Sequence, residues 1–293
     1  MKNILVLLSG LLLISCNNEP KQQAAATIAT TKPVIENNGV RIVYNDSGKG
    51  DTALLFLHGW GINRSYWDEQ VQHFSDRYRV VTLDLPGFGE SGKNRTDWSV
   101  ENYGKDINLV IDSLKLKNVI LIGHSMSGAL IVETARQNPS AIAGIIGIDN
   151  FKNYGGKMSE ADRKSMEDAY KELRVNFKGV LEVFAQQLFA ESTPKQVKDR
   201  VLHDATSGDT VIAVNIMEKN DGYALDSNLK ALHKKLYLVN SDYNKNDSAS
   251  FTRNNIPYRL LTIHATGHYP MLEKPAEFDQ LLTQAIHEIS MDK

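Results

Sequence analysis

The stretch of sequence that decides the fold reads Val119-Ile120-Leu121-Ile122-Gly123-His124-Ser125-Met126-Ser127-Gly128-Ala129. Its apolar, β-branched start is typical of a buried strand, and the pattern from Met126 to Gln137 is typical of a helix. The strand and the helix meet in a tight turn with Ser125 at its apex. Because the amino end of a helix carries partial positive charge, it favours negative charge that develops near this hydroxyl. The stretch therefore predicts a strand–turn–helix unit that presents a serine at a helix terminus.

Strand-like and helix-like segments alternate on both sides of this unit. The predicted strands are Val40–Asn45, Ala53–Leu57, Arg79–Leu83, Val119–Ile122, Ala143–Ile148, Leu236–Val239 and Tyr258–Ile263. The predicted helices between and after them are Arg64–Phe74, Val100–Leu114, Met126–Gln137, Ser248–Asn254 and Pro275–Ile289. Such alternation predicts an α/β fold with a mostly parallel, doubly wound sheet of about eight strands.

The alternation stops between Phe151 and about Lys230, where the pattern is mostly helical, polar and charged. Helices are predicted over Ser159–Leu173, with Ser159 as a plausible N-cap, and over Val180–Phe189. This segment separates two strands of the sheet. We therefore predict a helical cap over residues 151–230, inserted between strands 6 and 7 of a core formed by 34–150 and 231–293.

Composition and charge narrow the class of protein. Of 293 residues, 42% are hydrophobic and 23% are charged, which is typical of a globular chain. The 33 basic and 35 acidic side chains leave a net charge of -2, so no nucleic-acid partner is expected. The single cysteine, Cys16, excludes an intramolecular disulfide and a multi-cysteine metal site. No clustered ligands point to a metal or a cofactor, and we expect a monomer.

The amino-terminal segment has the features of an export signal. One positive charge, Lys2, precedes an apolar run from Ile4 to Ile14. The run is shorter than the ~20 residues of a membrane span and has the size of a signal-peptide core. Its end, Leu13-Ile14-Ser15-Cys16, resembles a bacterial lipobox, whose cysteine receives a lipid. The resemblance implies a signal peptide over 1–15, a lipidated Cys16 with a flexible tether over 16–33, and a periplasmic or outer-membrane lipoprotein of the bacterial cell envelope. An ordinary secretory signal is the alternative.

The stretch around Ser125 resembles the nucleophile elbow of the alpha/beta-hydrolase family, whose pattern is Gly-x-Ser-x-Gly. The serine of such an elbow has a strained backbone, so the residues two before it and two after it must be small. Gly123 fits this pattern, whereas Ser127 stands where the family has glycine and Gly128 follows one residue later. The resemblance implies that Ser125 is a nucleophile at the carboxyl edge of the sheet.

Two further segments resemble the same family in the same order. Leu57-His58-Gly59-Trp60-Gly61 resembles the oxyanion loop, which implies that the backbone N–H groups of Trp60 and Met126 form the oxyanion hole. Asp84-Leu85-Pro86-Gly87-Phe88-Gly89-Glu90-Ser91 resembles the glycine-rich loop that shapes the site in this family. We interpret His58 and Asp84 as structural residues.

The segment Ala265-Thr266-Gly267-His268-Tyr269-Pro270-Met271-Leu272-Glu273-Lys274-Pro275 resembles the family's G-H-x-x-x-x-E-x-P pattern. This resemblance implies that His268 is the base that takes the proton of Ser125 and returns it to the leaving group.

The acid of the triad is where the sequence departs from the family. The usual G-x-x-D pattern aligns with Ser241 and Asn244, and an amide cannot stabilise a charged imidazole as a carboxylate does. Asp149 ends the strand Gly144–Ile148, a position that some capped relatives, including certain haloalkane dehalogenases, use for the acid. Asp242 lies two residues before the usual site. We favour Asp149, with Asp242 as the alternative acid; Asn244, Asp247 or no acid stays open.

The residue types favour acyl transfer. Dehalogenases and epoxide hydrolases of this fold use aspartate at the elbow, whereas a serine attacks an ester, thioester, lactone or amide and forms an acyl-enzyme. We therefore predict a carboxylesterase-like serine hydrolase whose partners are a small-molecule acyl substrate and, through Cys16, a membrane. The alternatives are a cofactor-free perhydrolase or haloperoxidase-like enzyme, a carbon–carbon bond hydrolase, and a non-catalytic lipoprotein that binds a ligand in a degenerate hydrolase pocket.

Overall fold

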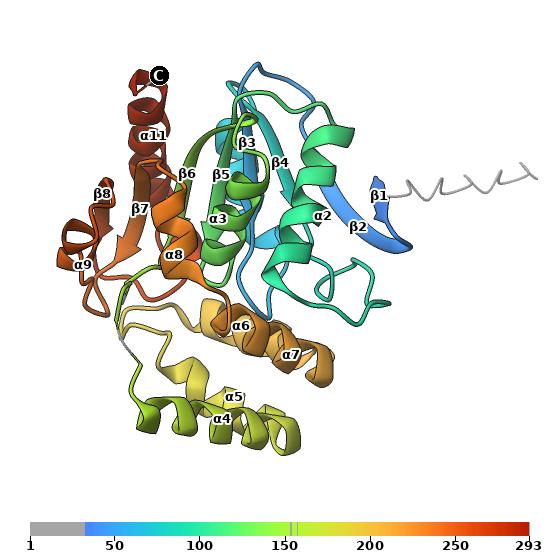
Figure 1. Ribbon diagram of the computed structural model, residues 1–293, viewed down its shortest axis with the longest axis vertical. Coiled ribbons are helices and arrows are strands. Elements are labelled where there is room, and N and C mark those ends of the chain that lie inside the picture. The colour runs from blue at the N-terminus through green and yellow to red at the C-terminus, as the bar shows by residue number, and fades with distance from the viewer. Residues whose placement is uncertain (1–32, 153, 157, 293) are drawn as a thin grey trace, which may run out of the picture. The chain divides into compact units, whose positions relative to one another are not determined.

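The computed structural model describes residues 33–152, 154–156 and 158–292, which contain an eight-stranded sheet with helices on both faces (Figure 1). The strand order is β1-β2-β4-β3-β5-β6-β7-β8. β2 is antiparallel to β1 and β4, and the remaining neighbours are parallel. The strands are β1 Val34–Asn37, β2 Val40–Asp46, β3 Ala53–Leu57, β4 Arg79–Leu83, β5 Val119–His124, β6 Ile142–Ile148, β7 Leu236–Ser241 and β8 Tyr258–Ile263. The predicted α/β fold with a mostly parallel, doubly wound sheet is confirmed.

The central strands are buried along their whole length because helices cover both sides of the sheet. Every residue of β3, β5 and β7 is buried. Alternate residues of β3 pack into different cores: Leu55 and Leu57 into one, Leu54 and Phe56 into the other. A strand that is buried on both faces needs apolar side chains on each face, so it reads as a near-continuous apolar run in the sequence.

The helices follow the strands along the chain. They are the 3-10 helix η1 Arg64–Trp67 and the α-helices α1 Asp68–Phe74, α2 Val100–Ser113, α3 Ser127–Gln137, α4 Glu160–Val175, α5 Phe177–Gln186, α6 Lys195–Thr206, α7 Thr210–Asp221, α8 Leu225–Ala231, α9 Ala249–Arg253, α10 Pro270–Glu273 and α11 Pro275–Met291. Residues of α2, α3 and α8 share one core with the sheet, and residues of α1 and α11 share the core on its other face. This division matches the layers on the two sides of the sheet in Figure 1.

Helices α4 to α8 form the insertion between β6 and β7, as the sequence predicts. Ser159 is the N-cap of α4 and forms a reciprocal capping box with Asp162. Helices α4, α5 and α7 share a small apolar core of their own, and α4 to α7 lie beyond one end of the sheet in Figure 1. Helix α8 packs instead against α3 of the sheet layer, with Leu229 in the core there.

The predictions for residues 1–33 fall almost entirely outside the described part of the chain. The predicted signal segment, Cys16 and almost all of the tether lie outside the described residues. Strand β1, which directly follows them, was not predicted, because it is short and no residue in it is fully buried. Within the described part of the chain, no helix is long and apolar enough to cross a membrane.

Candidate active site

Ser125 lies in a sharp turn between β5 and α3, with a positive φ of 52°. Such a conformation is uncommon for a residue with a side chain and marks a strained position. The turn brings Gly123 so close to α3 that a Cβ there would lie 2.6 Å from the carbonyl oxygen of Ser127. Ser127, where the family pattern has glycine, is fully buried and its hydroxyl donates to the carbonyl of His58 at 2.5 Å. The elbow therefore accommodates this serine and uses its hydroxyl to hold the loop after β3.

Three residues predicted from the sequence lie together at the carboxyl edge of the sheet. The Ser125 Oγ atom is 2.8 Å from His268 Nε2. The other ring nitrogen of His268, Nδ1, is 2.6 Å from Asp149 Oδ2. Parallel strands end at this edge, so residues that follow β5, β6 and β8 meet there although they are far apart in the sequence. The contacts form a continuous path from hydroxyl to imidazole to carboxylate.

The Asp149 carboxylate is almost completely buried and saturated with donors. Its Oδ1 atom accepts from the backbone N–H of Ser241 at 2.9 Å and from the Ser241 hydroxyl at 2.5 Å, and it lies 2.8 Å from Lys152 Nζ. Burial alone would favour the neutral acid, but hydrogen bonds and charges from His268 and Lys152 outweigh it and hold the pKa of Asp149 well below its usual value. The structure thus places an ionised carboxylate against the imidazole.

The other candidate acids are not brought to His268. Asp242 is exposed; one oxygen lies 2.7 Å from His264 Nδ1, and the other accepts from the N–H of Ala265. Asn244 is also exposed, and Asp247 pairs with Arg253. Of the acids considered from the sequence, Asp149 alone has the geometry of a triad member.

The loop that carries His268 is fixed from three sides. Glu273 accepts from the backbone N–H groups of Gly267 and Tyr269, which explains the acidic residue of the motif. The N–H of His268 donates to the carbonyl of Leu188, in the segment after α5, at 2.8 Å. Its carbonyl lies 2.8 Å from His124 Nε2. Burial, with His268 beside it, lowers the pKa of His124 to about 3, so this ring is neutral and donates through Nε2–H.

The predicted oxyanion residues lie next to the elbow. Trp60 and Met126 line the same cavity as Ser125. The indole of Trp60 donates to the carbonyl of Ala213 in α7, and Asn220 of α7 donates to the carbonyl of Met126. The cap therefore holds both segments whose backbone N–H groups the family uses as donors.

His58 and Asp84 have structural surroundings. His58 Nε2 accepts from the N–H of Leu85, and its Nδ1 donates to the carbonyl of Gly59. Asp84 is fully buried and is paired with Arg64. Both residues shape the loops beside the site rather than face the nucleophile.

The cavity above Ser125 has a volume of about 570 Å³. Its walls come mainly from apolar side chains of the cap, and Asp221 is the carboxylate among them. The cap residues in the lining are Met166, Ala169, Tyr170, Leu173, Val180, Leu181, Phe184, Ala185, Leu188, Val201, Leu202, Ala205, Met217, Asn220 and Asp221. Pockets of this kind bind small molecules through an apolar surface and a few fixed polar groups.

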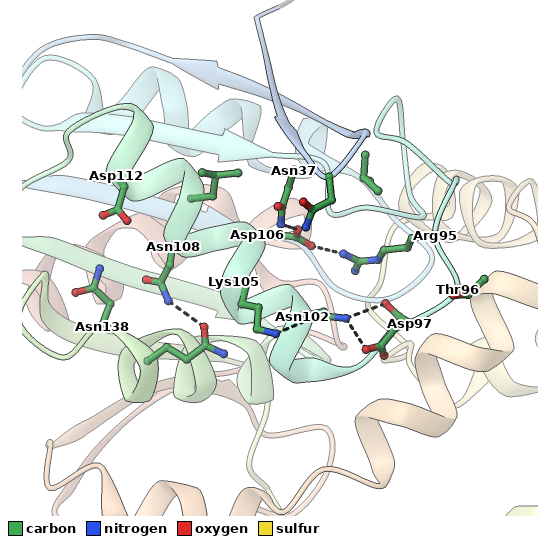
Figure 2. A pocket seen from close by; sticks show the side chains of 14 residues that line it. Asn37, Arg95, Thr96, Asp97, Asn102, Lys105, Asp106, Asn108, Asp112 and Asn138 are labelled. Atoms are coloured by element: carbon green, nitrogen blue, oxygen red, sulfur yellow. Dashed lines mark hydrogen bonds and ion pairs between the residues drawn. The ribbon is translucent and has the colours of Figure 1, made fainter.

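A larger cavity of about 920 Å³ lies along α2, near the turn between β1 and β2 (Figure 2). Its polar groups mostly bond to one another: Asp106 accepts from Asn37 and Arg95, and Asp97 accepts from Asn102 (Figure 2). None of its lining residues is a serine, cysteine or histidine. The larger cavity thus has no imidazole to act as a base, whereas the smaller one holds Ser125 and His268 together.

The fold and the elbow define a class of protein, the α/β enzymes that carry a nucleophile on a strand–helix turn. A family model described as alpha/beta hydrolase fold matches residues 52–275. The chain therefore belongs to the alpha/beta hydrolase family.

Similar proteins match the chain over different shares of its length. Strigolactone esterase D14 of Arabidopsis thaliana is 23% identical, over 86% of this chain and 97% of its own length. A non-heme chloroperoxidase of Streptomyces lividans is 33% identical over 38% of this chain and 41% of its own. The solved structure of an esterase from Exiguobacterium antarcticum superposes with a TM-score of 0.76 at 20% identity, over 87% of this chain and 99% of the other. These similar proteins are named for different reactions.

One group at the site was missed by sequence reasoning. Lys152 contacts the carboxylate of Asp149 from only three residues away. The spacing alone does not indicate this contact, because it depends on a turn in which Asp149 and Phe151 both have positive φ. A lysine shortly after a candidate acid is the one signal that could have drawn attention to it.

Proposed function

We propose that this protein is a serine hydrolase that cleaves a carboxylic ester, or a related thioester, lactone or amide, of an apolar acyl group. The observation that carries the proposal is the path from Ser125 Oγ through His268 to Asp149, with distances of 2.8 and 2.6 Å, beneath an apolar cavity.

In the proposed reaction, the Ser125 oxygen attacks the carbonyl carbon while His268 Nε2 takes the hydroxyl proton. The negative charge on the carbonyl oxygen is stabilised by the backbone N–H groups of Trp60 and Met126. Collapse of the tetrahedral intermediate breaks the bond to the leaving group, which receives the proton from His268. Water, deprotonated by the same imidazole, then attacks the acyl carbon; the bond to Ser125 Oγ breaks, His268 returns the proton to that oxygen, and the acid leaves. Asp149 stabilises the imidazolium in both halves of the reaction.

The walls of the cavity indicate which acyl groups fit. A volume of about 570 Å³ suits a small to medium acyl chain. Asp221 lines this cavity and accepts a hydrogen bond from the hydroxyl of Tyr170. Burial raises the pKa of Asp221, and the hydrogen bond from Tyr170 opposes that effect. In its ionised form Asp221 repels a second carboxylate, so neutral acyl chains are the proposed substrates and acyl chains that end in an acid are disfavoured.

A fluorophosphonate probe tests the proposal, because it reacts with an activated serine without requiring the natural substrate. We expect the wild-type protein to be labelled at Ser125, Ser125→Ala to be unlabelled, and the control Ser227→Ala, which changes an exposed serine of α8, to be labelled normally. Absence of labelling in folded wild-type protein would contradict the proposed function. A panel of p-nitrophenyl esters of increasing acyl length then identifies the preferred chain.

We also propose that Cys16 carries a lipid and holds the enzyme on the bacterial cell envelope, supported by Lys2, the apolar run and the lipobox-like Leu13-Ile14-Ser15-Cys16. Two or more acyl chains are sufficient for stable membrane anchoring. Bacteria expressing the full chain and fed labelled palmitate should incorporate label into the wild type. Cys16→Ser should lose the label, whereas Ser15→Ala, which keeps a small residue before the cysteine, should retain it. An unlabelled wild type would rule out the anchor.

A further inference from the structure

Lys152 lies behind the carboxylate of the triad, on the side away from His268. It is in the turn after β6, and its ammonium lies 2.8 Å from Asp149 Oδ1 and 3.0 Å from the Ser241 hydroxyl. The same ammonium lies 4.2 Å from the ring centroid of Tyr243, within the range of a cation–π interaction. A carboxylate, a hydroxyl and an aromatic face therefore hold this charge in one place.

The position is unusual because a lysine is rarely removed from water. Only 11% of the Lys152 side chain is exposed, against 0% for the side chain of Asp149. Burial lowers the pKa of Lys152, and the carboxylate of Asp149 opposes that effect. A buried charge of this kind is retained at a cost in desolvation, so its contact with the triad calls for a functional explanation.

The contacts divide the two oxygens of Asp149 between different partners. Oδ1 is occupied by Lys152 and by the backbone N–H and hydroxyl of Ser241, whereas Oδ2 faces His268 Nδ1. The carboxylate therefore cannot rotate without losing three donors at once. In addition, the ammonium neutralises part of the negative charge that the carboxylate presents to the imidazole.

We propose that Lys152 is a positioning residue of the triad: it fixes the orientation of Asp149 and limits how strongly that carboxylate stabilises the protonated form of His268. The inference rests on the proposed function, since it concerns the same triad. It assigns Lys152 a role in setting the pH range in which the base is available.

The sign of the effect follows from the charges around the two groups. Lys152 faces Asp149, Tyr243 and, through space, Asp242. His268 faces Asp149, and its ring also lies near the uncharged rings of Tyr243, His124 and Tyr269. A positive charge at Lys152 disfavours a second positive charge on His268, so removing it favours protonation of the imidazole. The base would then be lost at a higher pH.

The test measures the rate of fluorophosphonate labelling of Ser125 against pH, because this rate falls when His268 is protonated. Three variants separate the effect of the charge from that of the hydrogen-bond donor. Lys152→Met removes the charge and the donor, Lys152→Gln keeps a donor without the charge, and Lys152→Arg keeps the charge. The control Lys171→Met removes an exposed lysine of α4 that pairs with Asp168.

We expect the acid limb of the profile to move up by about half to one pH unit in Lys152→Met and Lys152→Gln. Lys152→Arg and Lys171→Met should follow the wild-type profile. With an ester substrate, kcat should fall several-fold in Lys152→Met while KM is unchanged, because Lys152 is not among the residues that line the cavity.

The outcomes are distinct. If the wild type is not labelled at any pH, the proposed function itself fails. If the wild type is labelled and folded Lys152→Met and Lys152→Gln keep its acid limb, only the role of Lys152 is refuted, since a purely structural ion pair would change thermal stability without moving that limb. An equal shift in Lys152→Arg would also refute the inference, because charge would not be the cause.

Discussion

Replacing Asp149 with asparagine tests the acid of the proposed triad. The carboxylate accepts from four donors, namely His268 Nδ1, Lys152 Nζ and the N–H and hydroxyl of Ser241. An amide keeps the shape but carries no charge, and its NH₂ group must face one of these donors. We therefore expect both catalysis and stability to suffer.

The magnitude follows from the two interactions that are lost. Loss of a triad carboxylate lowers kcat by up to about 10⁴-fold, which corresponds to about 5 kcal/mol of transition-state stabilisation. Leaving Lys152 buried without its partner costs about 3–5 kcal/mol of unfolding free energy, the range for a broken buried ion pair. The two effects have different readouts, since the first appears in kcat and the second in denaturant unfolding.

The assay compares Asp149→Asn with Asp242→Asn at pH 7, using an ester hydrolysed by the wild type. Asp242 is exposed and bonded to His264, so its variant should change kcat by less than about twofold and unfolding by less than about 0.5 kcal/mol. A folded Asp149→Asn protein that retains more than about a tenth of wild-type kcat would refute the assignment. So would a larger loss in Asp242→Asn.

Three further changes have expected outcomes. Burial lowers the pKa of His124 to about 3 in the folded protein, so below about pH 6.5 the unfolded chain takes up this proton first, and this group lowers the stability by up to about 1.4 kcal/mol per pH unit as pH drops. In urea unfolding, His124→Gln should show a shallower slope than the wild type, and part of the slope should stay because burial also lowers the pKa of His58. The compared quantity is the ratio of kcat/KM for an ester whose acyl chain ends in a carboxylate to kcat/KM for its methyl-ended analogue. Asp221→Asn should raise this ratio several-fold, and the control Asp168→Asn, on the exposed surface of α4, should leave it unchanged. Ser127→Ala leaves the carbonyl of His58 without its donor and should cost about 1–3 kcal/mol in urea unfolding, whereas no loss would mean that the hydroxyl does not hold the loop.

The positions of Ser125 and His268 could be predicted because their signals are local. Ser125 lies in a strand–turn–helix unit whose geometry depends on adjacent residues, and His268 lies in a loop whose Glu273 bonds to the loop itself. The sheet could be predicted for the same reason, since burial on both faces makes β3 apolar throughout and β5 apolar from Val119 to Ile122.

The carboxylate that faces His268 was harder to predict because its position depends on distant contacts. Asp149 and Asp242 both follow strands that end at the same edge, and the sequence does not show which carboxylate turns inward. The positive φ of Asp149 and the donors on Ser241 decide this in the structure. Strand β1 depends in the same way on pairing with β2, and its own residues carry a weak signal.

The hydrogen bond from the N–H of His268 to the carbonyl of Leu188 has a consequence for protein engineering. The cap cannot be exchanged as an independent module, because one of its backbone groups supports the loop that carries His268. A chimera with a foreign cap needs an acceptor at the position of Leu188, or the imidazole of His268 will be misaligned although Ser125, His268 and Asp149 are all still there. Transplanting substrate preference between relatives of this fold therefore means grafting this junction together with the pocket walls.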